Sequence, residues 1–230
     1  METNLYPNKT FQIILDVWKI QSGLSRIIRW EDWLEKLGEK FLRKQTCTEH
    51  TMSIEFAARY IVDLHISLSN EPIDRELILD AIHFHDYGES LKGRDISALK
   101  KKDTDDCNEY LAFVSFISKF HKPLFQRYRK AFLLQFCLNN ADCFPKEARE
   151  IMAELYKNNY KEAFMFQLIE NWDYLLYAVE QYQEKENPEI LKQVLTRSRP
   201  ITEKYRKIFP ELFETFLDPT TLAWEKEFLK

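Results

Sequence analysis

Apolar residues recur every three or four positions along much of the chain, and this spacing is typical of helices with one buried face. One such stripe follows Thr46 and Thr48, either of which can cap the helix, and it contains Ile54, Ala57, Ala58, Ile61, Leu64 and Leu68. One turn before Ile54, the same face reaches His50. His50 is therefore predicted to point inward at the start of its helix.

A second stripe also ends in polar side chains. It begins after Asp74, the predicted N-cap, and runs through Ile78, Ala81, Ile82, His85 and Glu89. Gly88 and Gly93 are expected to mark the helix end and a turn. The neighbouring residues His85 and Asp86 thus lie near the end of an apolar helix, where both side chains are costly to bury without a partner.

The longest helix is predicted from about Tyr160 to Glu186. Its stripe carries Phe166, Ile169, Asp173, Leu176 or Tyr177, and Glu180. Asp173 is therefore placed in the middle of a helix that is apolar nearly all round. A buried carboxylate there requires a partner inside the protein.

Helices are predicted for most of the remaining chain as well. They are expected at about Lys9–Gln21, Leu24–Lys44 (divided from the first at Ser22 and Gly23), Asp106–Phe120, Pro123–Leu138 and Pro145–Lys157, with a polar loop over 94–106. Only 4 Gly and 8 Pro occur among 230 residues, and Leu, Ile, Glu and Lys are abundant, which favours an all-α fold. We expect one domain over 1–230, with a core over about 25–186 and a proline-containing tail of short helices, 187–230, packed on it.

Charge and cysteine usage narrow the class of protein. The net charge is −4 and the pI about 5.8, which disfavours a nucleic-acid binder that works by bulk electrostatics. The lysines at 100–102 precede Asp103, Asp105 and Asp106, so a solvated loop is expected there. No signal peptide opens the chain, no apolar run approaches the ~20 residues of a membrane span, and the four cysteines form no C-x-x-C pair. We therefore expect a cytoplasmic protein with reduced thiols.

Three helices thus each deliver polar groups to a buried face: His50, the pair His85 and Asp86, and Asp173. A lone His on an apolar face is more often a satisfied core histidine, so only the conjunction of all four indicates a divalent metal. Two imidazoles and two carboxylates suit Mn²⁺, Fe²⁺, Co²⁺, Ni²⁺ or Zn²⁺ and leave coordination positions open for water and substrate. Glu89 lies one helical turn after His85 on the same face, where it can orient the attacking water.

The motifs "TEH", "HFHDYGES" and "ENWD" resemble the H…HD…D signature of the HD-domain superfamily of metal-dependent phosphohydrolases. The stretches "RKQTCTEH", "HDYGESLKGRD" and "LIENWDYLLYAVEQYQ" are most similar to the 5′-deoxynucleotidase branch, and the likeness spans about Ser25–Phe216. The resemblance implies one divalent metal, with Mn, Co, Mg, Fe, Ni and Zn as candidates. Its ligands would be His50, His85, Asp86 and Asp173, and Glu89 would act on the attacking water.

The resemblance also implies residues that contact the substrate. Arg29 and Trp30 correspond to a pair that contacts phosphate and senses the sugar 2′ position. Arg43 is either a phosphate ligand or a helix-terminal surface charge. The branch's Gly-Asp pair reads Gly-Arg-Asp here, so either Arg94 or Asp95 takes its place, with Asp95 as the candidate acid for the leaving group.

The expected activity is hydrolysis of phosphate from a small-molecule nucleotide, a (deoxy)nucleoside 5′-monophosphate, by attack of a water held on the metal. The first alternative is a triphosphate or modified nucleotide as substrate, and the second is a catalytically degenerate nucleotide-binding domain. An oxidative two-iron centre would need more ligands, but only His121 follows His85 among the histidines. No nucleic acid and no membrane is expected as a partner, and the resemblance suggests a homodimer.

Overall fold

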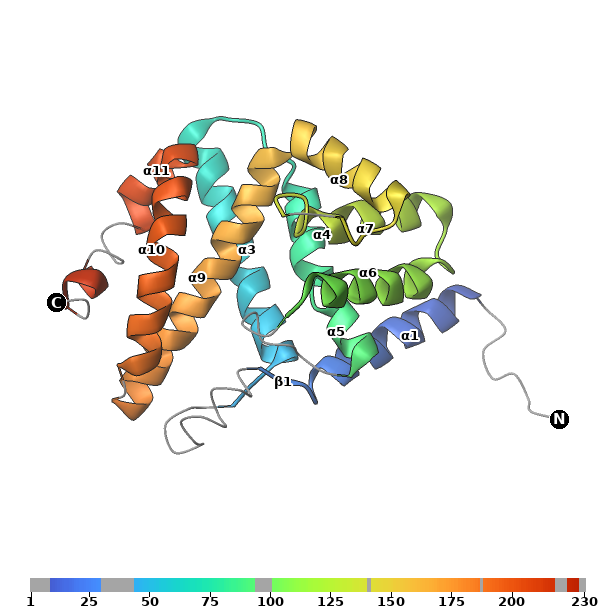
Figure 1. Ribbon diagram of the computed structural model, residues 1–230, viewed down its shortest axis with the longest axis horizontal. Coiled ribbons are helices and arrows are strands. Elements are labelled where there is room, and N and C mark those ends of the chain that lie inside the picture. Colours follow the sequence, from blue (N-terminus) through green and yellow to red (C-terminus); the bar gives the residue numbers. More distant parts are fainter. Residues whose placement is uncertain are drawn as a thin grey trace.

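The computed structural model describes residues 9–29, 44–93, 101–139, 142–186, 188–217 and 223–227. Within these ranges the chain is helical apart from turns and one short ribbon, which confirms the predicted all-α class (Figure 1). The elements are α1 (Lys9–Leu24), β1 (Ile28–Arg29), β2 (Gln45–Thr46), α3 (Cys47–Ser69), α4 (Arg75–Phe84), α5 (Tyr87–Lys92), α6 (Asp103–Ile117), α7 (Lys122–Leu134), α8 (Lys146–Asn158), α9 (Tyr160–Lys185), α10 (Glu189–Ile208) and α11 (Pro210–Leu212), followed by a π-helical turn at Phe213–Leu217.

Helices α3, α4 and α9 form the centre of the molecule, because each packs against the other two (Figure 1). α7 covers α4, α10 lies along α9, and α5 is held between α1 and α6. The predicted stripe of α3 is confirmed over most of its length, since Ile54, Ala58 and Ile61 are buried, whereas Leu68 at its end is exposed. Among the described residues, no helix combines the length and hydrophobicity that crossing a membrane requires.

The start of α3 is fixed by a capping box. The Thr46 side chain accepts a hydrogen bond from the Glu49 backbone N–H, and the Glu49 carboxylate accepts one from the Thr46 N–H at 2.7 Å. Thr46, one of the two predicted caps, is therefore the residue that begins the helix. The next backbone N–H, that of Cys47, donates to the carbonyl of Ile27 and ties the start of α3 to the residue just before β1. His50 is thereby held one turn inside a well-anchored helix end.

The helix predicted to carry the His85–Asp86 pair is interrupted at that pair. Asp74 caps α4 as predicted by accepting from the Leu77 N–H, but α4 ends at Phe84 and α5 begins at Tyr87. Asp86 has φ −89° and ψ −1°, so the chain turns there, whereas His85 keeps helical dihedrals and its N–H still donates to the Ala81 carbonyl. Gly93 ends α5 in the left-handed region, with φ 74°. Gly88 lies inside α5, so the prediction that it marks a helix end is wrong.

Gly88 is required by close packing of α5 against α6. A Cβ atom at residue 88 would lie 2.6 Å from the Glu109 Cβ and 3.1 Å from the Glu109 Cα and carbonyl oxygen. Backbone atoms cannot swing aside, so Gly88→Ala should force the helices apart and cost about 1–3 kcal/mol of unfolding free energy. Chemical denaturation measures this loss. Lys92→Ala, an exposed change on the same helix, should stay within about 0.5 kcal/mol, and equal midpoints for the two variants would contradict the close packing.

The predicted helix boundary at Ser22 and Gly23 is wrong. α1 continues through both residues to Leu24, and Ile28 and Arg29 form β1 instead of a second helix; the rest of that predicted helix lies outside the described residues. Gly23 has a packing role, because a Cβ there would meet the Ser90 Oγ at 2.5 Å. Ser90 donates to the Ile20 carbonyl across this contact, which joins α1 to α5.

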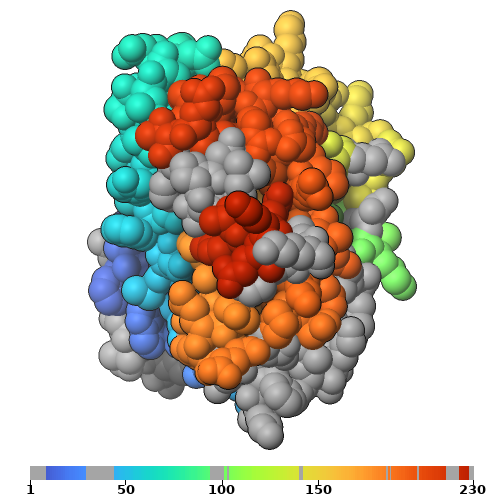
Figure 2. Space-filling model, turned by 90° about the vertical axis from the view of Figure 1, so that its left-hand side faces the viewer, coloured from blue at the N-terminus to red at the C-terminus, as the bar shows by residue number. Residues whose placement is uncertain are grey.

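The tail also differs from the predicted run of short helices. α10 is a 20-residue helix with Pro200 inside it. Proline removes one backbone hydrogen bond and normally disfavours a helix interior. The helix nevertheless continues because it packs along α9 and buries Ile190, Leu191, Leu195 and Tyr205. Figure 2 shows α10 and the residues after it (orange to red) spread over this side of the molecule, with α3 (cyan) at the edge.

Candidate metal centre

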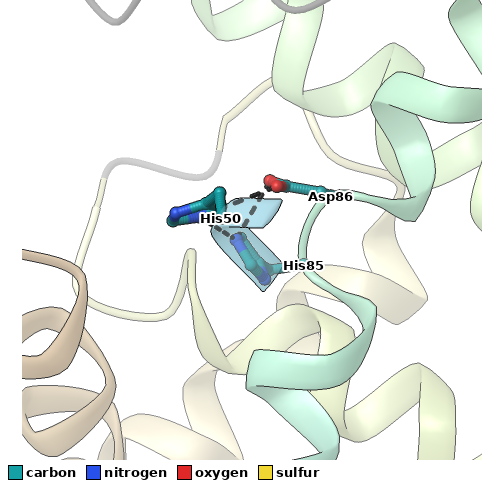
Figure 3. A group of neighbouring side chains, drawn as sticks. All are labelled: His50, His85 and Asp86. Atoms are coloured by element: carbon teal, nitrogen blue, oxygen red, sulfur yellow. Dashed lines mark hydrogen bonds and ion pairs between the residues drawn. The ribbon is translucent and has the colours of Figure 1, made fainter. Parts of the chain in front are cut away.

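His50, His85 and Asp86 converge at the meeting point of α3 and the turn between α4 and α5, and can hold a metal ion (Figure 3). The two histidine Nε2 atoms are 3.0 Å apart. Asp86 places its Oδ1 3.0 Å from the His85 Nε2 and its Oδ2 3.7 Å from the His50 Nε2. All three residues are buried, so the predicted convergence of these residues from separate parts of the sequence is confirmed.

The protonation of both imidazoles follows from the other ring nitrogen. The His85 Nδ1 lies 2.6 Å from the Ile82 carbonyl oxygen, which can only accept, so Nδ1 carries the hydrogen. The His50 Nδ1 lies 2.6 Å from the Asp173 Oδ2 and donates to that carboxylate. In the neutral rings, both Nε2 lone pairs therefore face each other. Such an arrangement is repulsive unless a proton or a metal ion lies between them.

Helix α9 adds two carboxylates to the site. Asp173 is buried as predicted, but it contacts His50 on the Nδ1 side of the ring, away from the Nε2 cluster. Glu170, which precedes it by one turn, places its Oε1 3.1 Å from the His85 Nε2 and 3.7 Å from the His50 Nε2. The role of Asp173 as a direct metal ligand stays a prediction.

Two buried carboxylate oxygens at the site lack a hydrogen-bond donor among the described residues. Within the described part of the chain, neither the Asp86 Oδ2 nor the Glu170 Oε1 has a hydrogen-bond partner, and both atoms are inaccessible to solvent. Orphaned buried carboxylate oxygens are costly, and a cation is the partner that they and the two Nε2 atoms can share. The donor set of imidazole and carboxylate therefore fits a divalent transition metal.

The pKa values reflect the same clustering of charge. Burial disfavours the imidazolium of His85, but the carboxylates of Asp86 and Glu170 outweigh it and raise its pKa to about 9. Burial alone would raise the pKa of Asp86, yet His85, His50 and Arg29 hold it well below its ordinary value. In the metal-free protein, positive charge is thus favoured at the position between the two Nε2 atoms.

Glu89 lies beside this centre on α5. It is buried, and the Cys47 thiol donates toward its Oε2 at a distance of 3.6 Å. Ligand atoms of Cys47, Asp86 and Glu89 all lie within 4.8 Å of one another, so Glu89 faces the same side as Asp86, as the helical spacing predicted. Cys47 was missed by sequence reasoning, because a single cysteine one residue after the cap gives no spacing signal.

Arg29 reaches the centre from β1. Its Nη1 lies 3.9 Å from the Asp173 Oδ2, its guanidinium lies 5.3 Å from the Tyr174 ring centre, and the side chain is buried. Among the described residues, this Nη1 has no hydrogen-bond partner. Burial disfavours the charge, but the nearby acidic groups, Asp86 and Glu170 among them, keep the pKa of Arg29 well above its ordinary value. A permanent cation with a free donor is thus placed beside the metal ligands.

Lys101 contradicts the predicted solvated loop. Its Nζ lies 2.8 Å from the Glu109 Oε2 and 3.0 Å from the Asp106 Oδ1, and most of the side chain is buried. The two acidic residues lie one turn apart on α6 and face back to the lysine that precedes the helix.

Four of the residues that were predicted to contact or act on the substrate lie outside the described residues: Trp30, Arg43, Arg94 and Asp95.

The chain was compared with protein families, curated proteins and solved structures. No family model matches it, and no curated protein or solved structure does so. The likeness to HD-domain phosphohydrolases therefore stays a prediction from the motifs, and the function must be argued from the site itself.

Proposed function

We propose that the chain is a metal-dependent phosphohydrolase of the HD-domain type that hydrolyses the phosphate ester of a (deoxy)nucleoside 5′-monophosphate. The observation that carries this proposal is the pair of histidine Nε2 atoms that face each other at 3.0 Å, beside orphaned oxygens of Asp86 and Glu170. A cationic side chain, that of Arg29, lies at the same centre, and within the described ranges its Nη1 has no hydrogen-bond partner. A site with a metal position and a permanent cation suits an anionic phosphate.

The roles of the residues follow from their positions. The bound metal would polarise a phosphate oxygen and lower the pKa of the attacking water. Arg29 would donate through Nη1 to a phosphate oxygen and so orient the ester. Glu89 would accept the proton of the water as its oxygen attacks phosphorus. The bond from phosphorus to the 5′ oxygen then breaks, and the leaving oxygen takes a proton, which gives a nucleoside and inorganic phosphate.

A substrate screen tests this function directly. The purified full chain, stripped with a chelator, is incubated with mono-, di- and triphosphate nucleotides in Mn²⁺, Co²⁺ or Mg²⁺, and phosphate and pyrophosphate release are followed. We expect phosphate release from monophosphates that depends on added metal and stops with chelator. Release from triphosphates alone would favour the alternative substrate, and nucleotide binding without release would favour a degenerate domain. Hydrolysis that persists at full rate in excess chelator would contradict the metal mechanism.

A further inference from the structure

We infer that Glu170 is the fourth protein ligand of the metal, and that Asp173 is a positioning residue that holds His50 in its metal-binding orientation. This inference rests on the proposed metal site and changes the assignment of its ligands.

The ring of His50 separates the two carboxylates. Its Nδ1 donates to Asp173 and its Nε2 faces His85, and the two nitrogens of one imidazole point in divergent directions. A carboxylate that ligates the same ion as the Nε2 must lie on the Nε2 side. Glu170 does so, with its Oε1 3.7 Å from the His50 Nε2 and 3.1 Å from the His85 Nε2.

The two carboxylates also differ in how well they are already satisfied. Asp173 accepts from His50 and from Ser53, and Arg29 lies 3.9 Å away. The Glu170 Oε1 is buried and has no hydrogen-bond partner in the described part of the chain. A carboxylate on the outer nitrogen of a ligating histidine is the usual device that fixes its tautomer. Asp173 therefore has the contacts of a positioning residue. The Glu170 Oε1, which faces the two Nε2 atoms without a hydrogen-bond donor among the described residues, has the environment of a metal ligand.

Charge balance points the same way. With both imidazoles neutral, Asp86 and Glu170 bring two negative charges to a divalent ion, while Asp173 is balanced by Arg29. If Asp173 were the ligand instead, the Glu170 Oε1 would lie 3.1 Å from a metal-bound Nε2, that of His85, with no hydrogen-bond donor among the described residues and no bond to the ion. The helical spacing permits the exchange, because residues 170 and 173 share one face of α9 and the longer Glu side chain can reach across one turn.

Metal affinity and the visible spectrum of bound Co²⁺ test the inference without any activity measurement. The full chain is stripped of metal, and wild type is compared with Glu170→Gln and Asp173→Asn. Glu170→Gln should weaken Co²⁺ binding by more than the roughly 10–100-fold typical of an outer partner, and should change the Co²⁺ absorption bands because a ligand is lost. Asp173→Asn should stay within that roughly 10–100-fold range and keep the bands of wild type.

Glu162→Gln is the matched control. Glu162 is another buried carboxylate of α9, but it lies about two turns before Glu170, and its Oε1 already accepts a hydrogen bond from the Asp74 backbone N–H. Its replacement should leave Co²⁺ affinity and bands unchanged. The inference is overturned if Asp173→Asn alters the bands while Glu170→Gln leaves them and the affinity as in wild type. That result would leave the proposed function intact, whereas a wild type that binds no Co²⁺ would refute both.

A crystal structure of wild type with Mn²⁺ decides the question even if a variant fails to fold. The Glu170 Oε1 should lie at carboxylate-ligand distance from the ion, and the Asp173 Oδ2 should remain on the His50 Nδ1. An ion bound by Asp173 with Glu170 turned away would overturn the inference.

Discussion

Asp86→Ala should remove metal binding and turnover together. Asp86, like Glu170, contacts both Nε2 atoms, and its loss leaves the ion with fewer ligands and one fewer negative charge. The side chain makes no capping hydrogen bond to α5, so alanine removes no helix cap. We therefore expect a folded protein whose Co²⁺ affinity falls by more than the roughly 10–100-fold of an outer partner, with phosphate release at background. Metal titration and the phosphate assay measure the two effects.

Asp63→Ala serves as the control for this variant. Asp63 pairs with Arg75 on the surface, at 2.7 Å, and such exposed pairs contribute little. Its replacement should keep metal content and rate. An Asp86→Ala protein that retains both the ion and the parent rate would contradict the role of Asp86 as a metal ligand.

The sequence predicted the convergence of His50, His85 and Asp86 because each interrupts an otherwise apolar pattern. Burial of such residues is expensive, so their inward position already implied a shared partner. The pattern could not show that the chain turns at residues 85 and 86, because the apolar spacing continues across them. Just after the turn, Gly88 allows close contact of α5 with Glu109, a tertiary contact that apolar spacing does not encode.

The choice between the two carboxylates of α9 was also beyond the sequence. Glu170 and Asp173 lie three residues apart on one helical face, so periodicity places both toward the site. It cannot show which of the two carboxylates would bind the metal. Which of them faces the His50 Nε2 depends on the orientation of the imidazole, and that is fixed by contacts distant in sequence. Arg29 illustrates the same limit, since it was expected on a helix and reaches the centre from a two-residue strand.

Glu89→Gln should lower kcat strongly while the metal remains bound. Glu89 is buried beside Asp86, yet the two Nε2 atoms and the oxygens that face them come from other residues. Glutamine keeps the shape and has a similar helix propensity, so the fold should not change. If Glu89 takes the proton of the attacking water, its loss removes help worth roughly 10²–10⁴-fold, or about 3–5 kcal/mol of barrier.

Steady-state kinetics at saturating metal, combined with metal titration, measure the effect of Glu89→Gln. We expect kcat to fall by at least roughly a hundredfold with KM little changed, because glutamine removes an interaction made in the transition state. Glu76→Gln, an exposed change of the same kind on α4, should match the parent. A Glu89→Gln protein that binds metal and turns over within about threefold of the parent differs by well under 1 kcal/mol in barrier. Proton removal from the attacking water would then be independent of Glu89. Glu89 would instead have a structural role, through its buried contact with the Cys47 thiol beside Asp86.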